Sequence, residues 1–214
     1  QSDHKYASMV KALDNSVGRI LDAVKAMSLD ENTIILFSSD NGGLSTLAKF
    51  GPTADMPLRA GKGWCYEGGI RVPLIIRAPG IDTSNTIIDT PAISMDFFPT
   101  LLDLAGLPAR PDLHKDGVSL KPLLEGDSIE DRSLFWHYPH YHGSTWKPGA
   151  AIRDGDWKLV QSYEWETVEL YNLKDDIGES NDLSEKYPEK TQELLAKLKV
   201  MQEETGSKLP YPKS

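Results

Sequence analysis

The chain has 214 residues, of which 39% are hydrophobic and 26% are charged, and its formal net charge is −9. This composition is typical of a globular protein with one ordinary core or two small ones, not of a disordered chain. No apolar run reaches the ~18 residues that a membrane span needs, and the negative charge argues against a general attraction to nucleic acid, so any anion site must be local.

The first predicted elements are a helix and a strand, the order that is typical of α/β folds. Apolar residues recur at spacings of three and four from residue 6 to residue 27, which predicts an amphipathic helix. Thr33–Phe37 is a short, β-branched apolar run, which favours a central strand covered on both faces. A second strand is predicted over Val72–Arg77, and Pro79 and Gly80 predict the turn that closes it.

The later part of the chain has a different pattern. A helix is predicted over residues 97–105, with Asp96 as its N-cap and Gly106 at its end. Short segments then predict an antiparallel sheet with strands at 134–137, 150–153, 157–161 and 169–171, followed by a helix over Glu189–Glu203. Two domains are therefore expected, an α/β domain over residues 1–126 and a small α+β subdomain over residues 127–214.

Two adjacent oxygen donors, Asp40 and Asn41, come directly after the first predicted strand. In open α/β sheets the functional groups gather beyond the carboxyl ends of the strands. Hard cations such as Mg²⁺ and Ca²⁺ prefer carboxylate and amide oxygens. Asp-Asn-Gly is also a common turn sequence, because Asn and Gly tolerate left-handed backbone. A metal site and a plain turn are both open at this position.

Lys62 lies on a glycine-rich loop, between Gly61 and Gly63. Most lysines are solvated surface residues, and that is the ordinary interpretation. The flanking glycines have no side chains, so a substrate could approach the backbone closely. A solvated loop lysine and a lysine that binds an anionic substrate are therefore both open at Lys62.

The two motifs together, TIILFSSDNGG and GKGWCYEGGIRVPLIIRAPG, resemble the second half of the type I sulfatases. These are formylglycine-dependent sulfate ester hydrolases of the alkaline phosphatase superfamily. The resemblance covers nearly all of the chain and implies the C-terminal part of an alkaline-phosphatase-like sandwich, followed by a small antiparallel sheet with a C-terminal helix. It implies that Asp40 and Asn41 supply part of a Ca²⁺ shell. It also implies that Lys62 contacts the sulfate group and helps neutralise charge on the leaving oxygen.

The nucleophile motif of the family, CxPxR or SxPxR, does not occur in the sequence. The single cysteine, Cys65, is followed by Tyr66 and Glu67 and cannot be the nucleophile. The formylglycine and the remaining metal ligands are therefore expected in an N-terminal portion of the same protein that precedes this chain. We expect the chain alone to be inactive and to bind metal weakly, because two donors cannot fill the six to eight places that Ca²⁺ prefers.

Two further motifs have less specific patterns. Glu67 and Arg71 flank a glycine pair, and charge-assisted hydrogen bonds from them are expected to hold the loop. The run LFWHYPHYHG contains His137, His140 and His142 among aromatic residues, which fits a metal site, a sugar-binding surface or plain packing. Zinc is disfavoured because no cysteines accompany the histidines. Contact of His137 or His140 with a sulfated sugar is the hypothesis carried forward.

The predicted function is that of a sulfuric ester hydrolase acting on a sulfated small molecule or a sulfated carbohydrate. Family resemblance implies a periplasmic or secreted location. One alternative is a phosphodiesterase or phosphonate hydrolase of the same superfamily, since the metal and anion chemistry is shared. Another is a non-catalytic anion-binding or interaction module.

Overall fold

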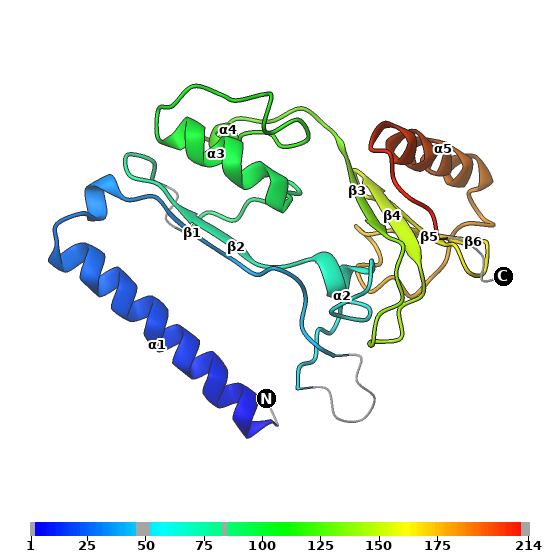
Figure 1. The fold of residues 1–214 in the computed structure, drawn as a ribbon, viewed down its shortest axis with the longest axis horizontal. Helices are drawn as coiled ribbons and strands as arrows, with labels where there is room; N and C mark the ends of the chain where they lie inside the picture. The colour runs from blue at the N-terminus through cyan, green and yellow to red at the C-terminus, as the bar shows by residue number, and fades with distance from the viewer. Residues whose placement is uncertain (1–2, 46–51, 83–84, 211–214) are drawn as a thin grey trace. The chain divides into compact units, whose positions relative to one another are not determined.

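The structure is a computed structural model that describes residues 3–45, 52–82 and 85–210 (Figure 1). It divides into two compact units, which we call the sheet unit and the helix unit. The sheet unit comprises Gln1–Tyr6, Ser39–Val72 and Asp131–Ser214, and the helix unit comprises Ala7–Ser38 and Pro73–Glu130. The loop that carries Asp40 and Asn41 and the loop that carries Lys62 therefore both belong to the sheet unit. The predicted domain boundary between residues 126 and 127 stays a prediction.

A four-stranded antiparallel sheet, with its strands in sequence order, forms the centre of the sheet unit. The elements are β3 (Ser133–Tyr138), β4 (Gly149–Asp154), β5 (Trp157–Ser162), β6 (Thr167–Asn172) and the following helix α5 (Pro188–Glu204). They confirm the four predicted strands and the last predicted helix. β3 ends immediately before Pro139, because proline has no N–H to donate to the ladder.

The two faces of this sheet carry separate apolar cores, because successive side chains of a strand point to opposite faces. On one face Ala151 belongs to a buried cluster with Cys65 and Trp146. On the other face Ile152 belongs to a cluster with Leu194 of α5. One core therefore fixes the C-terminal helix, and the other fixes the segment that follows Lys62.

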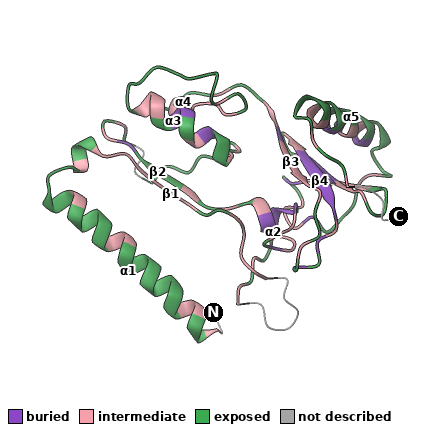
Figure 2. Cartoon of the chain, viewed as in Figure 1, coloured by how far each residue is buried: buried purple, intermediate pink, exposed green. Residues whose placement is uncertain are grey.

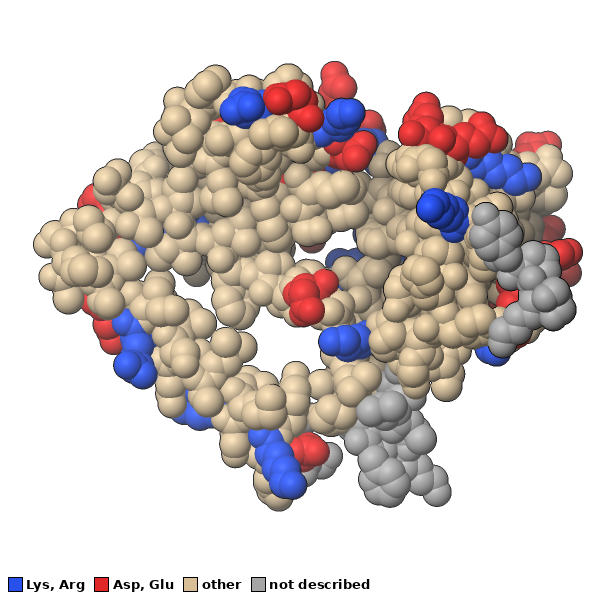
Figure 3. Space-filling model, in the orientation of Figure 1, with Lys and Arg blue, Asp and Glu red and all other residues tan. Residues whose placement is uncertain are grey.

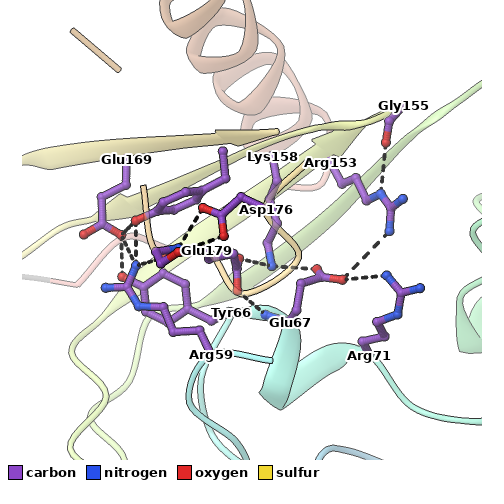
Figure 4. Close-up of polar contacts among 12 residues, drawn as sticks. Arg59, Tyr66, Glu67, Arg71, Arg153, Gly155, Lys158, Glu169, Asp176 and Glu179 are labelled. Carbon is purple, nitrogen blue, oxygen red and sulfur yellow. Dashed lines mark hydrogen bonds and ion pairs between the residues drawn. The ribbon is translucent and has the colours of Figure 1, made fainter. Parts of the chain in front are cut away.

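A buried ionic network joins that segment to the sheet (Figure 4). Lys158 of β5 is fully buried, and its Nζ donates to Glu67 Oε1 at 2.8 Å and lies 2.7 Å from Glu179 Oε1. The Glu67 backbone N–H donates to Glu179 Oε2 at 2.7 Å. Arg71 and Arg153 lie 3.5 Å and 3.9 Å from Glu67 Oε2. The ionic contacts confirm the structural role predicted for Glu67 and Arg71.

The two carboxylates of this network differ in their protonation behaviour. Burial raises the pKa of Glu179, and the attraction of Lys158 opposes that rise only in part. Burial acts in the same direction on Glu67, but Lys158 and the two arginines outweigh it, so the pKa of Glu67 lies below its usual range. Glu67 is therefore the more firmly ionised partner of Lys158.

A second polar cluster lies beside the first, at the residue before α2 (Glu67–Ile70). The Tyr66 hydroxyl donates to Glu169 of β6, and the Arg59 guanidinium lies 3.8 Å from the centre of the Tyr66 ring. Arg59 also donates to the Tyr171 hydroxyl at 2.6 Å. Burial, together with the hydrogen bond to Glu169, raises the pKa of Tyr66. Both clusters therefore hold the same short segment on the sheet.

The helix unit contains most of the N-terminal helix and a two-stranded sheet. Its first elements are α1 (His4–Ala26, mostly in this unit), η1 (Asp30–Asn32), β1 (Ile35–Ser38) and β2 (Leu74–Arg77). β1 and β2 are antiparallel, and Ile35 pairs with Arg77. Every residue of β1 is half-buried, and in the described chain β2 is its one neighbouring strand. The prediction of a central strand covered on both faces is therefore wrong for the described chain. The turn predicted at Pro79 and Gly80 is confirmed.

The second part of the helix unit is organised around Asp96. Its elements are η3 (Ser94–Asp96), α3 (Phe97–Leu104) and α4 (Lys121–Leu124). The buried Asp96 carboxylate accepts the N–H groups of Ile93 at 2.8 Å and Val118 at 3.0 Å. Its backbone is already helical, so the prediction that Asp96 caps α3 is wrong, and the side chain closes the preceding turn instead. Gly106 follows α3 with φ +67°, the conformation expected after a helix end.

Helix α1 confirms the predicted helix, but its apolar residues are exposed. It has no buried residue, and Met9 and Ile20 are 68% and 63% exposed. Figure 2 shows α1 mostly in the colour of exposed residues. None of the helices in the described ranges has the length and apolar character of a membrane span. The described chain therefore leaves the apolar face of α1 uncovered.

Replacement of Lys158 by alanine should destabilise the chain by about 3–5 kcal/mol, because two buried carboxylates then lose their cation. Urea unfolding of the purified chain, followed by tryptophan fluorescence, measures this change. The exposed Lys199 on α5 provides a matched control, and Lys199→Ala should stay within about 0.5 kcal/mol of the parent. A loss of under about 1 kcal/mol for Lys158→Ala would show that the network contributes little to stability.

Candidate functional site

The loop that carries Asp40 and Asn41 is joined directly to the loop that carries Lys62. The Lys62 N–H donates to the Gly43 carbonyl at 2.8 Å, and the Gly42 N–H donates to the Gly69 carbonyl at 2.9 Å. These two bonds bring together residues that are 19 and 27 positions apart in sequence. The backbones of the two predicted loops are therefore packed against each other in the sheet unit.

Glycine is required where the two loops touch. A Cβ atom at Gly42 would lie 1.7 Å from the Gly68 carbonyl oxygen, and one at Gly61 would lie 2.3 Å from Ser45 Oγ. Ser45 Oγ donates to the Ala60 carbonyl at 2.6 Å, which fixes the start of the lysine loop. The glycines therefore allow close backbone packing, in addition to the substrate access that the sequence suggested.

The predicted metal ligands lie at an accessible position. Asp40 is exposed, Asn41 is half-buried, and Asn41 Nδ2 donates to Asp40 Oδ2 at 2.6 Å. In the described ranges there is no group of three or more His, Cys, Asp or Glu residues that could hold a metal. The adjacent carboxylate and amide thus fit part of a shell for a hard cation, and a complete site needs further oxygen donors. Their metal role stays a prediction.

Lys62 is exposed, and in the part of the chain that the structure describes no acidic side chain forms an ion pair with it. The hydrogen bond to Gly43 holds the Lys62 backbone, so the point at which the side chain leaves the backbone is fixed while the ammonium group reaches solvent. On the face shown in Figure 3, basic and acidic side chains lie interspersed in small groups. The net charge of −9 requires any anion site at Lys62 to be local. Its contact with sulfate stays a prediction.

Cys65 is buried behind the lysine loop, with 3% of its surface exposed. Burial raises the pKa of its thiol to about 12. The reactive form of cysteine is the thiolate, so this residue is inert at neutral pH. The structure therefore agrees with the inference that Cys65 is not the nucleophile.

The two histidines predicted to contact substrate lie in different surroundings. His137 Nδ1 is 2.8 Å from the Tyr163 hydroxyl, and its Nε2 is 3.1 Å from the Lys208 carbonyl. Both nitrogens of His137 are thus engaged within the protein. His140 is exposed and lies edge-on to the Tyr138 ring at 5.9 Å. Substrate binding by either residue stays a prediction, and the contacts of His137 give it a structural role.

The third histidine of the run, His142, lies against the lysine loop. A Cβ atom at Gly63 would be 2.1 Å from His142 Nδ1, so the imidazole ring covers the residue next to Lys62. The spacing of the three histidines does not show which way each ring points, so the sequence did not distinguish His142 from the other two. Ser144, two positions later, hydrogen bonds to the His142 ring.

A small recess with aromatic walls lies on the same unit and has a volume of about 30 Å³. Its walls include Trp64, Tyr66, Trp146 and the exposed Trp165. Neither Asp40 nor Lys62 is among the residues that line it.

Comparisons with known proteins identify relatives over most of the chain. The family model described as sulfatase matches residues 1–107, and the model described as the C-terminal part of N-sulphoglucosamine sulphohydrolase matches residues 60–206. A sulfatase of Formosa agariphila is 40% identical over 213 residues, covering 90% of this chain and 38% of that protein. An N-acetylglucosamine-6-O-sulfatase of Bacteroides thetaiotaomicron is 33% identical over 210 residues, covering 93% of this chain and 35% of that protein.

Solved structures show the same fold. The crystal structure of Ps i-CgsB in complex with k-i-k-neocarrahexaose superimposes with a TM-score of 0.80 at 28% identity, covering 92% of this chain and 42% of that one. The phosphonate monoester hydrolase of Agrobacterium radiobacter gives a TM-score of 0.68 at 26% identity, covering 92% and 40%. The predicted fold class is thereby confirmed. The chain spans about two fifths of the length of the relatives it matches.

Substitution of Gly42 by alanine should destabilise the chain by about 1–3 kcal/mol, since the new methyl group would overlap the Gly68 carbonyl. Gly18 offers a matched control, because it lies inside α1 and a methyl group added there would have no atom within 4 Å. Gly18→Ala should instead stabilise by up to about 1 kcal/mol, as expected for a helix interior. Urea unfolding of both variants tests the pair, and equal effects would contradict the close loop packing.

Proposed function

The chain belongs to the sulfatase family of the alkaline phosphatase superfamily, and from this premise we propose that the whole protein hydrolyses sulfate esters. The observation that carries the proposal is the direct backbone link between the Asp40–Asn41 loop and the Lys62 loop. A cation site and an anion-binding lysine are needed at the same place for such a reaction. This chain would supply part of that site and not all of it.

In the proposed site Asp40 and Asn41 hold one side of a divalent cation, with Ca²⁺ as the expected ion. The support is the donor chemistry, since both residues offer oxygen atoms and lie at an accessible loop. When bound, the cation would supply electrostatic stabilisation for the sulfate oxygens and the attacking group. The remaining ligands, and the formylglycine that would supply the nucleophile, are proposed to come from an N-terminal portion of the same protein.

Lys62 is proposed as the residue that binds the sulfate group and stabilises charge on the leaving oxygen. Its backbone is fixed by the hydrogen bond to Gly43, which reduces the reorganisation needed when substrate binds. A cation aimed at developing charge lowers the barrier because it interacts more strongly with the transition state than with the substrate. The absence of an acidic partner among the described residues leaves the ammonium group available for this contact.

A sulfated carbohydrate is the proposed substrate class. The support is the likeness to an N-acetylglucosamine-6-O-sulfatase and to a structure solved with a neocarrahexaose. The sulfatase family also includes relatives with other substrates, among them a steryl-sulfatase of Homo sapiens. A periplasmic or secreted location accompanies the proposal.

Hydrolysis of a phosphonate monoester is the second candidate function, because the phosphonate monoester hydrolase of Agrobacterium radiobacter has the same fold over this region. Sulfate and phosphonate monoesters both present a tetrahedral anionic centre, so Asp40, Asn41 and Lys62 suit either. Parallel assays of the full-length protein with 4-nitrophenyl sulfate and a phenyl phosphonate monoester separate the two. A non-catalytic anion-binding module would turn over neither compound.

The purified chain should show no turnover of 4-nitrophenyl sulfate and should bind Ca²⁺ with a dissociation constant of about 10⁻³ M or weaker, because most ligands are missing. Isothermal titration calorimetry and an absorbance assay provide the two measurements. Asp40→Ala should abolish the remaining Ca²⁺ signal. Turnover by the purified chain that disappears in Lys62→Ala would contradict the proposed division of the active site.

In the full-length protein, Lys62→Ala should lower kcat by ~10²-fold or more, because a charge-stabilising group is removed from the transition state. Steady-state kinetics with 4-nitrophenyl sulfate measures the loss. Lys174→Ala, which removes an exposed lysine from another loop of the sheet unit, is the matched control and should retain the parental rate. A normal rate for Lys62→Ala would show that the lysine is a solvated loop residue.

A further inference from the structure

The loop between β3 and β4, residues 139–148, is fastened to the lysine loop at two points. The Trp64 indole Nε1–H donates to the Ser144 carbonyl at 2.8 Å. The His142 ring lies over Gly63, where an added Cβ atom would be 2.1 Å from Nδ1. Gly63 and Trp64 immediately follow Lys62, so this loop is placed directly beside the proposed anion site.

The hydrogen bonds of Ser144 determine the tautomer of His142. The Ser144 backbone N–H donates to His142 Nδ1 at 3.1 Å, and the Ser144 hydroxyl lies 2.7 Å from the same nitrogen. A nitrogen that accepts a hydrogen bond carries no proton of its own. In the neutral ring the hydrogen is therefore on Nε2, which makes that nitrogen a donor.

The Nε2 atom of His142 is not used within the chain. In the described ranges no hydrogen bond or ion pair engages Nε2, whereas both nitrogens of His137 have partners. His142 is half-buried, and its partner Ser144 is buried with 1% exposed. Because Nδ1 is engaged by Ser144, the ring is oriented, and the Nε2–H group is available to donate to a ligand.

We propose that His142 contacts the substrate, donating from Nε2 to an oxygen of the sulfate ester that Lys62 binds. This inference rests on the proposed function, and it assigns the donor to His142 in place of His137 and His140. Lys62 would supply charge, and His142 would supply a directed N–H donor. A hydrogen bond to a charged acceptor is worth more than a neutral one, so the contact should affect affinity and rate measurably.

A pair of substitutions separates this role from a structural one. In His142→Asn the side-chain oxygen can accept from the Ser144 N–H as Nδ1 does, while the donor at Nε2 is lost. In His142→Gln the amide nitrogen reaches the position of Nε2 and keeps a donor there. His114→Asn makes the same chemical change in the helix unit and serves as the control.

The experiment measures two properties of the full-length protein, hydrolysis of 4-nitrophenyl sulfate and calorimetric binding of inorganic sulfate. We expect His142→Asn to lower kcat/KM and sulfate affinity by about 10- to 100-fold, which is the loss of one hydrogen bond to a charged group. His142→Gln should recover most of both, and His114→Asn should match the parent. The melting temperatures of the variants show whether the fold is retained.

Two results would overturn the assignment of His142. One is parental sulfate affinity in His142→Asn, and the other is an equal loss in the Asn and Gln variants, which would mean that the Nε2 donor is not responsible. Failure of the proposed function has a different signature, because the parent protein would then hydrolyse no sulfate ester. In that case a selective loss of sulfate binding in His142→Asn would still support the contact with a tetrahedral anion.

Discussion

The buried contact of Lys158 with Glu67 and Glu179 is the constraint on which the site depends. Charges are costly to bury, and this lysine is stable inside the sheet unit only because two carboxylates meet it. Glu67 begins the short helix that follows the lysine loop, so the ion pair fixes one end of that loop. The arginines beside Glu67 add further positive charge and keep this carboxylate ionised.

The other end of the lysine loop is fixed without charge. Backbone bonds from Lys62 and Gly42 join two loops whose glycines leave no room for a side chain between them. The ionic contacts of Glu67 and the backbone hydrogen bonds of Lys62 and Gly42 thus hold the two ends of the same short loop. Such a surface is preorganised, which is the property that lets a binding group favour the transition state.

The spacing of apolar and turn residues along the chain predicted most helices and strands. The features that it did not predict depend mainly on contacts between residues far apart in sequence. The short strand-like runs bounded by turn residues specify β3 to β6, and the leucines at helical spacing specify α5. Asp96 was misplaced as a cap because its partner Val118 lies 22 residues away, beyond any local rule. For the site, the pairing of Asp40 with Lys62 came from family resemblance, whereas the proposal of His142 among the three histidines depends on tertiary contacts of its ring. The direction of an irregular loop is not encoded in residue spacing.

The position of Glu179, near the end of the chain, has a consequence for shortened forms of the gene. A stop codon after β5 would remove Glu179 and Glu169, although both lie more than a hundred residues downstream of the lysine loop. Lys158 would then keep one carboxylate, and Tyr66 would lose its acceptor. Besides removing β6 and α5, such a truncation would therefore release the backbone that carries Lys62, the proposed anion-binding residue.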